Sequence, residues 1–159
     1  YIEPLFSSLI FAGISLIVTG ILLYITKFTT NNTRDINAKD AVMIGIAQAV
    51  SLIPAISRSA STISVALLSG IKKEEAAKFS FLIFIPAVLG SFILKLSDIS
   101  KSDINTFLYG IGLIVSFIVS YLTLGWLIKI IRGSKFYVFS YYCLLVGILI
   151  LVLGLLGVI

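Results

Sequence analysis

Three long stretches without a charged residue constrain the fold of this chain more than any other feature. They cover residues 4–26, 105–128 and 136–159. The first contains 23 residues, which corresponds to about 34 Å of α-helix and is enough to cross the hydrocarbon core of a bilayer. Only 12% of the residues are charged, against roughly 25% in soluble proteins. The sequence therefore excludes a soluble domain and predicts an all-α integral membrane protein.

The distribution of charge predicts four transmembrane helices in a single membrane domain over residues 1–159. We expect these helices at residues 5–26, 74–95, 105–131 and 137–159. Glycines recur in the apolar runs, where they allow helices to pack closely. The positions predicted to do so are Gly13, Gly20, Gly110, Gly112, Gly147, Gly154 and Gly157.

The segment at residues 40–70 does not fit a simple span, because Arg58 divides it. There are 17 uncharged residues between Asp40 and Arg58, and 13 between Arg58 and Lys72. Thirteen residues form only about 20 Å of helix. Pro54 and a cluster of hydroxyl residues lie at the division. Either two half-helices joined by a polar turn or one broken, membrane-crossing helix would explain this pattern.

Loop charges distinguish these two interpretations. If the segment returns to the face from which it came, nine lysines and arginines lie on one face and two on the other. If it crosses, the numbers are five and six. Positive charge concentrates on the cytoplasmic side of membrane proteins. We therefore predict a re-entrant helical hairpin at 40–70 in a multi-pass plasma-membrane protein, with cytoplasmic loops near 27–39, 72–78 and 129–135.

The turn of this predicted hairpin carries the residues that can bind a ligand. A half-helix capped by Ser57 or Ser59 points its unpaired N–H groups toward the turn, and Arg58 adds five donors in a fixed geometry. Phosphate or diphosphate suits such donors. An arginine flanked by apolar stretches indicates function, although arginine can also extend to the membrane interface and serine can bond to its own helix.

The candidate site follows from this chemistry. We assign Arg58 and Ser57 as catalytic residues. The predicted substrate-binding residues are Ser59, Thr62, Ser61 and Gln48. For Ser61, and also for Gln48, a role in helix packing is an equal alternative.

Other classes of site have little support in the sequence. The chain has no histidine and one cysteine, Cys143, so the usual general base and an internal disulfide are both missing. The turn has no carboxylate, and we predict no metal-binding residue. The net charge is +5, but the chain has no run of basic residues that could follow a nucleic-acid backbone. We therefore expect no nucleic-acid partner.

Two linked motifs resemble the undecaprenyl-diphosphatase family, the BacA-type bacitracin-resistance membrane phosphatases. The family pattern Pro-Gly-x-Ser-Arg-Ser-Gly-x-Thr matches at Pro54, Ser57, Arg58, Ser59 and Thr62. A second pattern, Ala-Ala-x-Phe-Ser-Phe with a later Ile-Pro, matches in residues 76–86. The resemblance implies hydrolysis of a polyprenyl diphosphate to the monophosphate, which recycles a lipid carrier for cell-wall synthesis.

The resemblance also implies that this chain is the C-terminal portion of an inverted-repeat architecture. The first repeat of such enzymes carries Glu-x-x-x-Glu and a histidine element, neither of which is present here. Through that acidic half the resemblance implies a divalent cation; we expect no cofactor in this chain itself. We therefore expect the N-terminal repeat to be absent and the isolated chain to be inactive. A homo-oligomer is also possible.

Two departures from the family pattern bear on the turn, because Ala55 and Ala60 replace glycines. A left-handed backbone at alanine costs about 1–2 kcal/mol, so either the turn avoids that conformation or the site is altered.

Two other functions stay open. The chain could be half of a polyprenyl-phosphate or anion transporter or flippase, or an inactive degenerate homologue.

Overall fold

The computed structural model describes residues 9–29, 32–99, 106–133 and 135–156, and most of these are helical. In chain order the elements are α2 (Leu9–Ile25), the short 3₁₀-helix η1 (Thr26–Phe28), α3 (Ala38–Val50), α4 (Arg58–Leu68), α5 (Lys73–Ile99), α6 (Thr106–Arg132) and α7 (Val138–Leu155). The described residues contain no β-strand, and their only extended pairing is a single bridge between Arg34 and Ile71. The predicted all-α class is confirmed.

Four helices are long and apolar enough to cross a membrane, as predicted. They cover Leu9–Phe28, Lys73–Lys95, Phe107–Arg132 and Val138–Leu155. Helix α5 continues through Pro86 and ends at Ile99, four residues beyond the expected end of that span. The outer ends of the first and last predicted spans, residues 5–8 and 157–159, lie outside the described residues. The chain is a multi-pass membrane protein.

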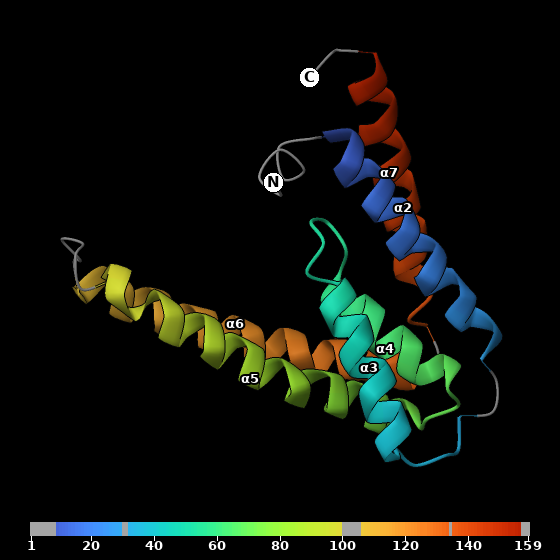
Figure 1. Cartoon of the computed structure of the whole chain (residues 1–159), viewed down its shortest axis with the longest axis horizontal. Helices are drawn as coiled ribbons and strands as arrows, with labels where there is room; N and C mark the ends of the chain where they lie inside the picture. Colours follow the sequence, from blue (N-terminus) through green and yellow to red (C-terminus); the bar gives the residue numbers. More distant parts are fainter. Residues whose placement is uncertain (1–8, 30–31, 100–105, 134, 157–159) are drawn as a thin grey trace.

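The long helices form two pairs that diverge from one end of the molecule (Figure 1). Helices α2 and α7 run antiparallel along each other, and α5 and α6 form the second pair. The shorter helices α3 and α4 lie where the two pairs approach each other. Helix α4 is the central element, because it contacts α2, α3 and α5.

Glycines allow α2 and α7 to pack at backbone distance. A Cβ atom added to Gly13 would lie 3.0 Å from the carbonyl oxygen of Gly147, and one added to Gly147 would lie 3.0 Å from that of Gly13. Gly20 and Gly154 lie in the same interface, against Leu144 and Ile10. These four positions act as predicted. Gly110 and Gly112 do not, because no neighbour lies within 4 Å of an added Cβ at either.

The segment at 40–70 forms two helices joined by a turn. Helix α3 begins with a capping box, in which the Asn37 side chain accepts from the Asp40 N–H and the Asp40 carboxylate accepts from the Asn37 N–H. The hairpin returns to its starting end, because Arg34 N–H donates to Gly70 O (3.1 Å) and Lys72 N–H donates to Arg34 O (2.9 Å). Its depth in a membrane stays a prediction.

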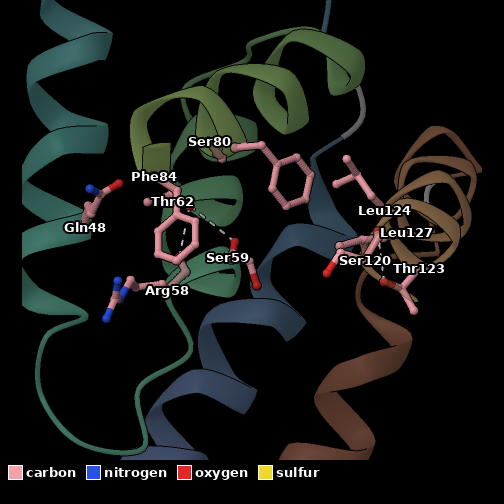
Figure 2. Close-up of a pocket in the computed structure, with 11 residues that line it drawn as sticks. Gln48, Arg58, Ser59, Thr62, Ser80, Phe84, Ser120, Thr123, Leu124 and Leu127 are labelled. Carbon is pink, nitrogen blue, oxygen red and sulfur yellow. Dashed lines mark hydrogen bonds between the residues drawn. The ribbon is translucent and has the colours of Figure 1, made fainter. Parts of the chain in front are cut away.

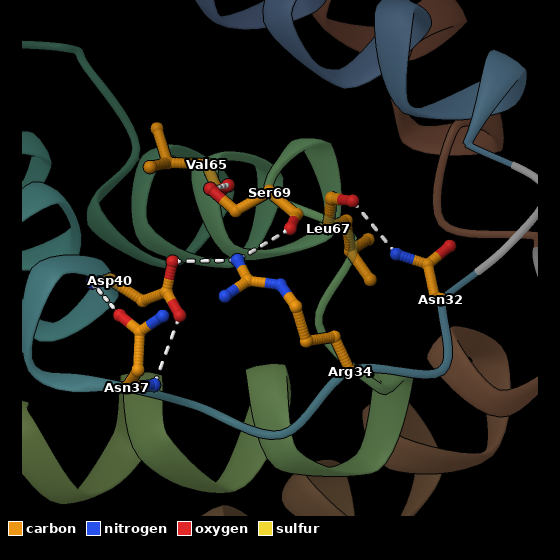
Figure 3. A network of polar contacts seen from close by, with 7 residues as sticks. All are labelled: Asn32, Arg34, Asn37, Asp40, Val65, Leu67 and Ser69. Carbon is orange, nitrogen blue, oxygen red and sulfur yellow. Dashed lines mark hydrogen bonds and ion pairs between the residues drawn. The ribbon is translucent and has the colours of Figure 1, made fainter.

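A polar network holds the two ends of this hairpin together (Figure 3). The Arg34 guanidinium donates to Asp40 Oδ1 and to the carbonyl of Ser69, both at 2.8 Å. The Asn32 side chain donates to Leu67 O at 2.7 Å. The hydrogen bond from Arg34, followed by that from the Asn37 backbone, lowers the pKa of Asp40. The ionised carboxylate thus stabilises the base of the hairpin.

The turn between α3 and α4 contains backbone strain at Ala55. Its φ is 62°, and it is the only non-glycine residue with a positive φ in the part of the chain that the structure describes. Ala60, in contrast, lies in the first turn of α4 and is buried. Of the two alternatives left open by the sequence, avoidance of a left-handed alanine does not hold at Ala55, while Ala60 has an ordinary helical conformation. The tight connection between the two helices imposes this conformation on Ala55.

We expect Ala55→Gly to raise the free energy of unfolding by about 1 kcal/mol, because glycine adopts a positive φ without the Cβ clash. Ala60→Gly is the matched control, since it replaces a helical residue and should lower the free energy of unfolding by about 1 kcal/mol. Denaturation of both variants in detergent micelles measures the difference. A destabilising Ala55→Gly substitution would contradict the left-handed turn.

We expect acid to loosen the base of the hairpin through Asp40. Its pKa is lowered in the folded chain, so its contribution is complete above the ordinary aspartate pKa of about 3.9 and is lost as the pH falls through the lowered value. Unfolding midpoints at pH 6 and pH 3 should therefore differ less in Asp40→Asn than in the parent chain. Asp35→Asn is the control: its side chain is 72% exposed against 5% for Asp40, so its pair with Lys72 should contribute little. Equal behaviour of the two variants would argue against this role of Asp40.

Candidate functional site

The candidate site is built around the first turn of α4. Ser57 is the N-cap, with its Oγ accepting from the Ala60 N–H at 3.3 Å, and Arg58 is the first helical residue. Of the two predicted caps, the structure selects Ser57. The Ser57 N–H lies 3.4 Å from Thr19 Oγ1 of α2, and the Thr19 hydroxyl donates to Ser15 O at 2.9 Å. Thr19, a buried residue of a transmembrane helix, therefore anchors the turn. It was not among the predicted site residues.

Arg58 presents a guanidinium without a protein counter-ion. Its central carbon lies 5.1 Å from the centre of the Phe84 ring, a cation–π contact from α4 to α5. Among the described residues no ion pair or hydrogen bond to its side chain is found, and the side chain is exposed. Stacking on one face of a guanidinium leaves its five in-plane donors available. The arginine is therefore held in place with its hydrogen-bonding capacity unused.

The hydroxyl groups of the turn have different surroundings. Thr62 Oγ1 donates to Arg58 O at 2.9 Å, and Ser61 Oγ donates to Ser57 O at 3.0 Å. Both side chains are buried. Ser59 Oγ lies 3.4 Å from Ser57 Oγ. Thr62 and Ser61 thus brace the first turn of the helix, while Ser59 is less constrained.

A cavity of about 470 Å³ opens beside this turn (Figure 2). Four of the six predicted site residues line it, and Ser57 and Ser61 do not. Those four are Gln48, Arg58, Ser59 and Thr62. The remaining lining residues come from α5 (Ser80, Phe81 and Phe84) and from α6 (Ser120, Thr123, Leu124 and Leu127).

The cavity has a polar and an apolar side. Arg58 is the one charged residue among those that line it, and the N-terminus of α4 adds a partial positive charge beside it. Phe81 and Phe84 of α5, with Leu124 and Leu127 of α6, supply the apolar surface. Such a cavity suits an amphiphile with an anionic head and a hydrocarbon chain.

The seven lining residues of α5 and α6 were not predicted as site residues, although their spacing carries a signal. On α6 they occur at positions 120, 123, 124 and 127, which is the repeat of one helix face. On α5, Ser80 and Phe81 belong to the second motif quoted above, and Phe84 follows one turn later. Helical spacing alone does not say which face meets a cavity.

Gln48 both lines the cavity and connects two helices. Its Nε2 donates to the carbonyl of Ile83 on α5 at 3.2 Å, and its backbone carbonyl accepts from Ser51 Oγ at 2.6 Å. Gln48 therefore helps to fix the distance between α3 and α5 at the cavity wall.

The cavity residues do not form a metal site. None of the lining residues is an aspartate, glutamate, histidine or cysteine. In the described parts of the chain, no three such residues come together in a way that could hold a metal ion. The donor groups of the cavity suit an anion, and they do not fit a divalent cation.

Comparison with known proteins identifies the family of the chain. Residues 1–149 match the family model described as bacitracin resistance protein BacA. The chain is 42% identical over 151 residues to an undecaprenyl-diphosphatase of Korarchaeum cryptofilum, covering 95% of this chain and 57% of the relative. It is 40% identical over 157 residues to undecaprenyl-diphosphatase 2 of Bacillus thuringiensis, covering 96% and 58%.

The match extends over nearly all of this chain but not over its relatives. An undecaprenyl-diphosphatase of Methanosphaera stadtmanae is 37% identical, with 96% of this chain and 56% of the relative covered. The chain thus spans somewhat more than half the length of the curated relatives it matches. No solved structure matches it. From the length and identity of these matches, the chain belongs to the bacitracin resistance protein BacA family.

Proposed function

We propose that this chain provides the diphosphate-binding part of an undecaprenyl-diphosphatase. In the net reaction, water supplies the oxygen that ends on the terminal phosphorus, and the bond from that phosphorus to the bridging oxygen breaks. If Ser57 attacks first, its Oγ bonds to the terminal phosphorus as the monophosphate leaves, and water then cleaves the bond between that phosphorus and Ser57 Oγ. Inorganic phosphate and the polyprenyl monophosphate are the products. The observation that carries the proposal is the guanidinium of Arg58, which has no counter-ion among the described residues, at the wall of a cavity otherwise lined by apolar groups, hydroxyls and the amide of Gln48.

Arg58 would bind the diphosphate and neutralise the charge that develops as the phosphoanhydride bond breaks. Its fork of donors can pair with two phosphoryl oxygens at once. The stacking contact with Phe84 restricts the side chain before the ligand arrives, which lowers the entropic cost of binding. The partial positive charge at the start of α4 acts on the same anion.

The neighbouring polar groups would complete the binding of the head group. Ser59 is placed to donate directly, and Gln48 lies at the same wall. The hydroxyl protons of Thr62 and Ser61 are used by backbone carbonyls in this structure, so these residues would bind a phosphoryl oxygen only after their hydroxyls rotate. Their more direct contribution is to hold the first turn of α4 in shape.

Ser57 is the second residue that we propose as catalytic. Its Oγ lies near Ser59, just outside the cavity lining, and accepts from the Ala60 N–H. A serine also needs a base to become a nucleophile. The chain contains no histidine, and the cavity lining contains no carboxylate. We therefore propose that the base, and any divalent cation, belong to the part of the relatives that this chain does not span. We expect the chain alone to bind the lipid without cleaving it.

Arg58→Lys tests the clamp, because lysine keeps the charge and loses the fork. We expect the dissociation constant for undecaprenyl diphosphate, titrated into the purified chain in detergent micelles, to rise about 10- to 100-fold, since hydrogen bonds between charged groups contribute about 1.5–3 kcal/mol. In a protein of full family length, we expect phosphate release to fall by orders of magnitude.

Arg132→Lys provides the matched control. This arginine pairs with Glu74 at 3.1 Å near the loops and does not line the cavity. Its replacement should leave both the affinity and the turnover nearly unchanged. Normal binding by Arg58→Lys would refute the clamp role. Normal binding by the parent chain, with no phosphate release even at full family length, would favour transport over hydrolysis.

The proposed orientation places the loops near 72 and 132 in the cytoplasm. The return of the hairpin to its starting end supports this, since Lys72 pairs with Asp35 and Arg132 pairs with Glu74 at that end. With Cys143 first replaced by serine, single cysteines at positions 72 and 132 should react only with reagent on the cytoplasmic side. A cysteine at position 95 should react from the opposite side. Labelling of 72 and 132 from opposite sides would mean that residues 40–70 cross the membrane.

A further inference from the structure

In the described part of the chain, three serine hydroxyls are buried in helices without a hydrogen-bond partner. They belong to Ser64 of α4, Ser80 of α5 and Ser140 of α7. A buried hydroxyl left unpaired costs about 1–3 kcal/mol. A serine in a membrane helix ordinarily avoids this cost by donating to the carbonyl four residues earlier, as Ser69 and Ser91 do. An unpaired serine hydroxyl therefore needs an explanation.

Ser80 differs from the other two in its position. Its side chain is 5% exposed, and it lines the cavity beside Arg58. Ser64 and Ser140 are completely buried and do not line that cavity. In the close-up of the cavity, Ser80 comes from α5, across from Ser59 and Thr62 of α4 (Figure 2). Ser80 therefore lies in the wall that a ligand would meet, with its unpaired Oγ buried just behind the surface of the cavity.

Ser80 is important because hydroxyl groups of the cavity can bind a ligand only with protons that they do not already donate to the protein. A hydroxyl has one proton to donate, and a phosphoryl oxygen of an ionised diphosphate only accepts. The Thr62 proton goes to Arg58 O, and the Thr123 proton goes to Val119 O or Ser120 O. The proton of Ser80 is not used by any described residue. Ser80 thus has an unused hydroxyl proton, and rotation of its side chain toward the cavity would let that proton reach a ligand.

We propose that Ser80 is a further substrate-binding residue, whose hydroxyl donates a hydrogen bond to an oxygen of the diphosphate held by Arg58. The inference rests on the proposed function and extends it, because it adds a ligand contact from α5 to those from α4. The diphosphate would then bridge the two helices. The cost of leaving Ser80 unpaired in the free protein is recovered when the ligand binds.

The test compares three serine-to-alanine variants of the whole chain in detergent micelles. Each variant removes one unpaired buried hydroxyl and leaves no new polar group unsatisfied, so we expect all three to fold. We expect Ser80→Ala to raise the dissociation constant for undecaprenyl diphosphate about tenfold. Ser64→Ala and Ser140→Ala should change it by less than about twofold. Undecaprenol, which has the same hydrocarbon chain without a diphosphate, should bind all four proteins equally.

The outcomes separate this inference from the function on which it rests. Equal diphosphate binding by Ser80→Ala and Ser140→Ala would overturn the role of Ser80 and leave the Arg58 site intact. A loss of undecaprenol binding as large as the loss of diphosphate binding would also overturn it, because the effect would then concern the shape of the cavity. If the parent chain binds the diphosphate no better than undecaprenol, both the proposed function and this inference fail.

Discussion

The closure of the α3–α4 hairpin at its base is the interaction on which the rest of the structure depends. Two backbone hydrogen bonds join Arg34 to Gly70 and Lys72, and the ionised Asp40 carboxylate binds the Arg34 side chain. These bonds return the chain to the end at which α3 began. They therefore place the turn, and with it Arg58, at the opposite end of the hairpin. Helix α4 can then contact α2, α3 and α5 at the same time.

The turn at the far end of this hairpin combines strain with unused hydrogen-bonding capacity. Ala55 has a left-handed backbone, which costs about 1–2 kcal/mol. Arg58 has no protein counter-ion among the described residues, and Ser80 has no partner for its hydroxyl. Such features are tolerated where a binding site needs them and the surrounding structure holds them in place. In this protein the holding contacts are the Ser57 cap, the bond from Ser57 to Thr19 and the stacking of Arg58 on Phe84.

The sequence identified candidate site residues where the signal was local, and their roles stay predictions. Arg58 between apolar stretches and Ser57 at the start of a helix are visible in a short window of residues, because charge and capping act over one turn. The prediction missed Thr19, Phe84 and Ser80, which lie on other helices. Each is an ordinary residue in an apolar run, and only its contact with α4 gives it a role. The glycines show the same limit of the sequence. Gly13 and Gly110 both lie in apolar runs, but only Gly13 packs against the backbone of a neighbouring helix.

The sequence by itself determined that this is an all-α membrane protein with four long apolar helices and a divided segment at 40–70, and it predicted an anion-binding turn at Arg58. It could do so because the hydrocarbon core excludes charge and unpaired backbone, so the length of an apolar run fixes what it can form. Only the tertiary structure decided which faces of α5 and α6 meet the turn, which hydroxyl protons are already used, and that Ala55 is left-handed. These properties depend on contacts between helices far apart in the chain, and helical periodicity does not specify the partner of a face.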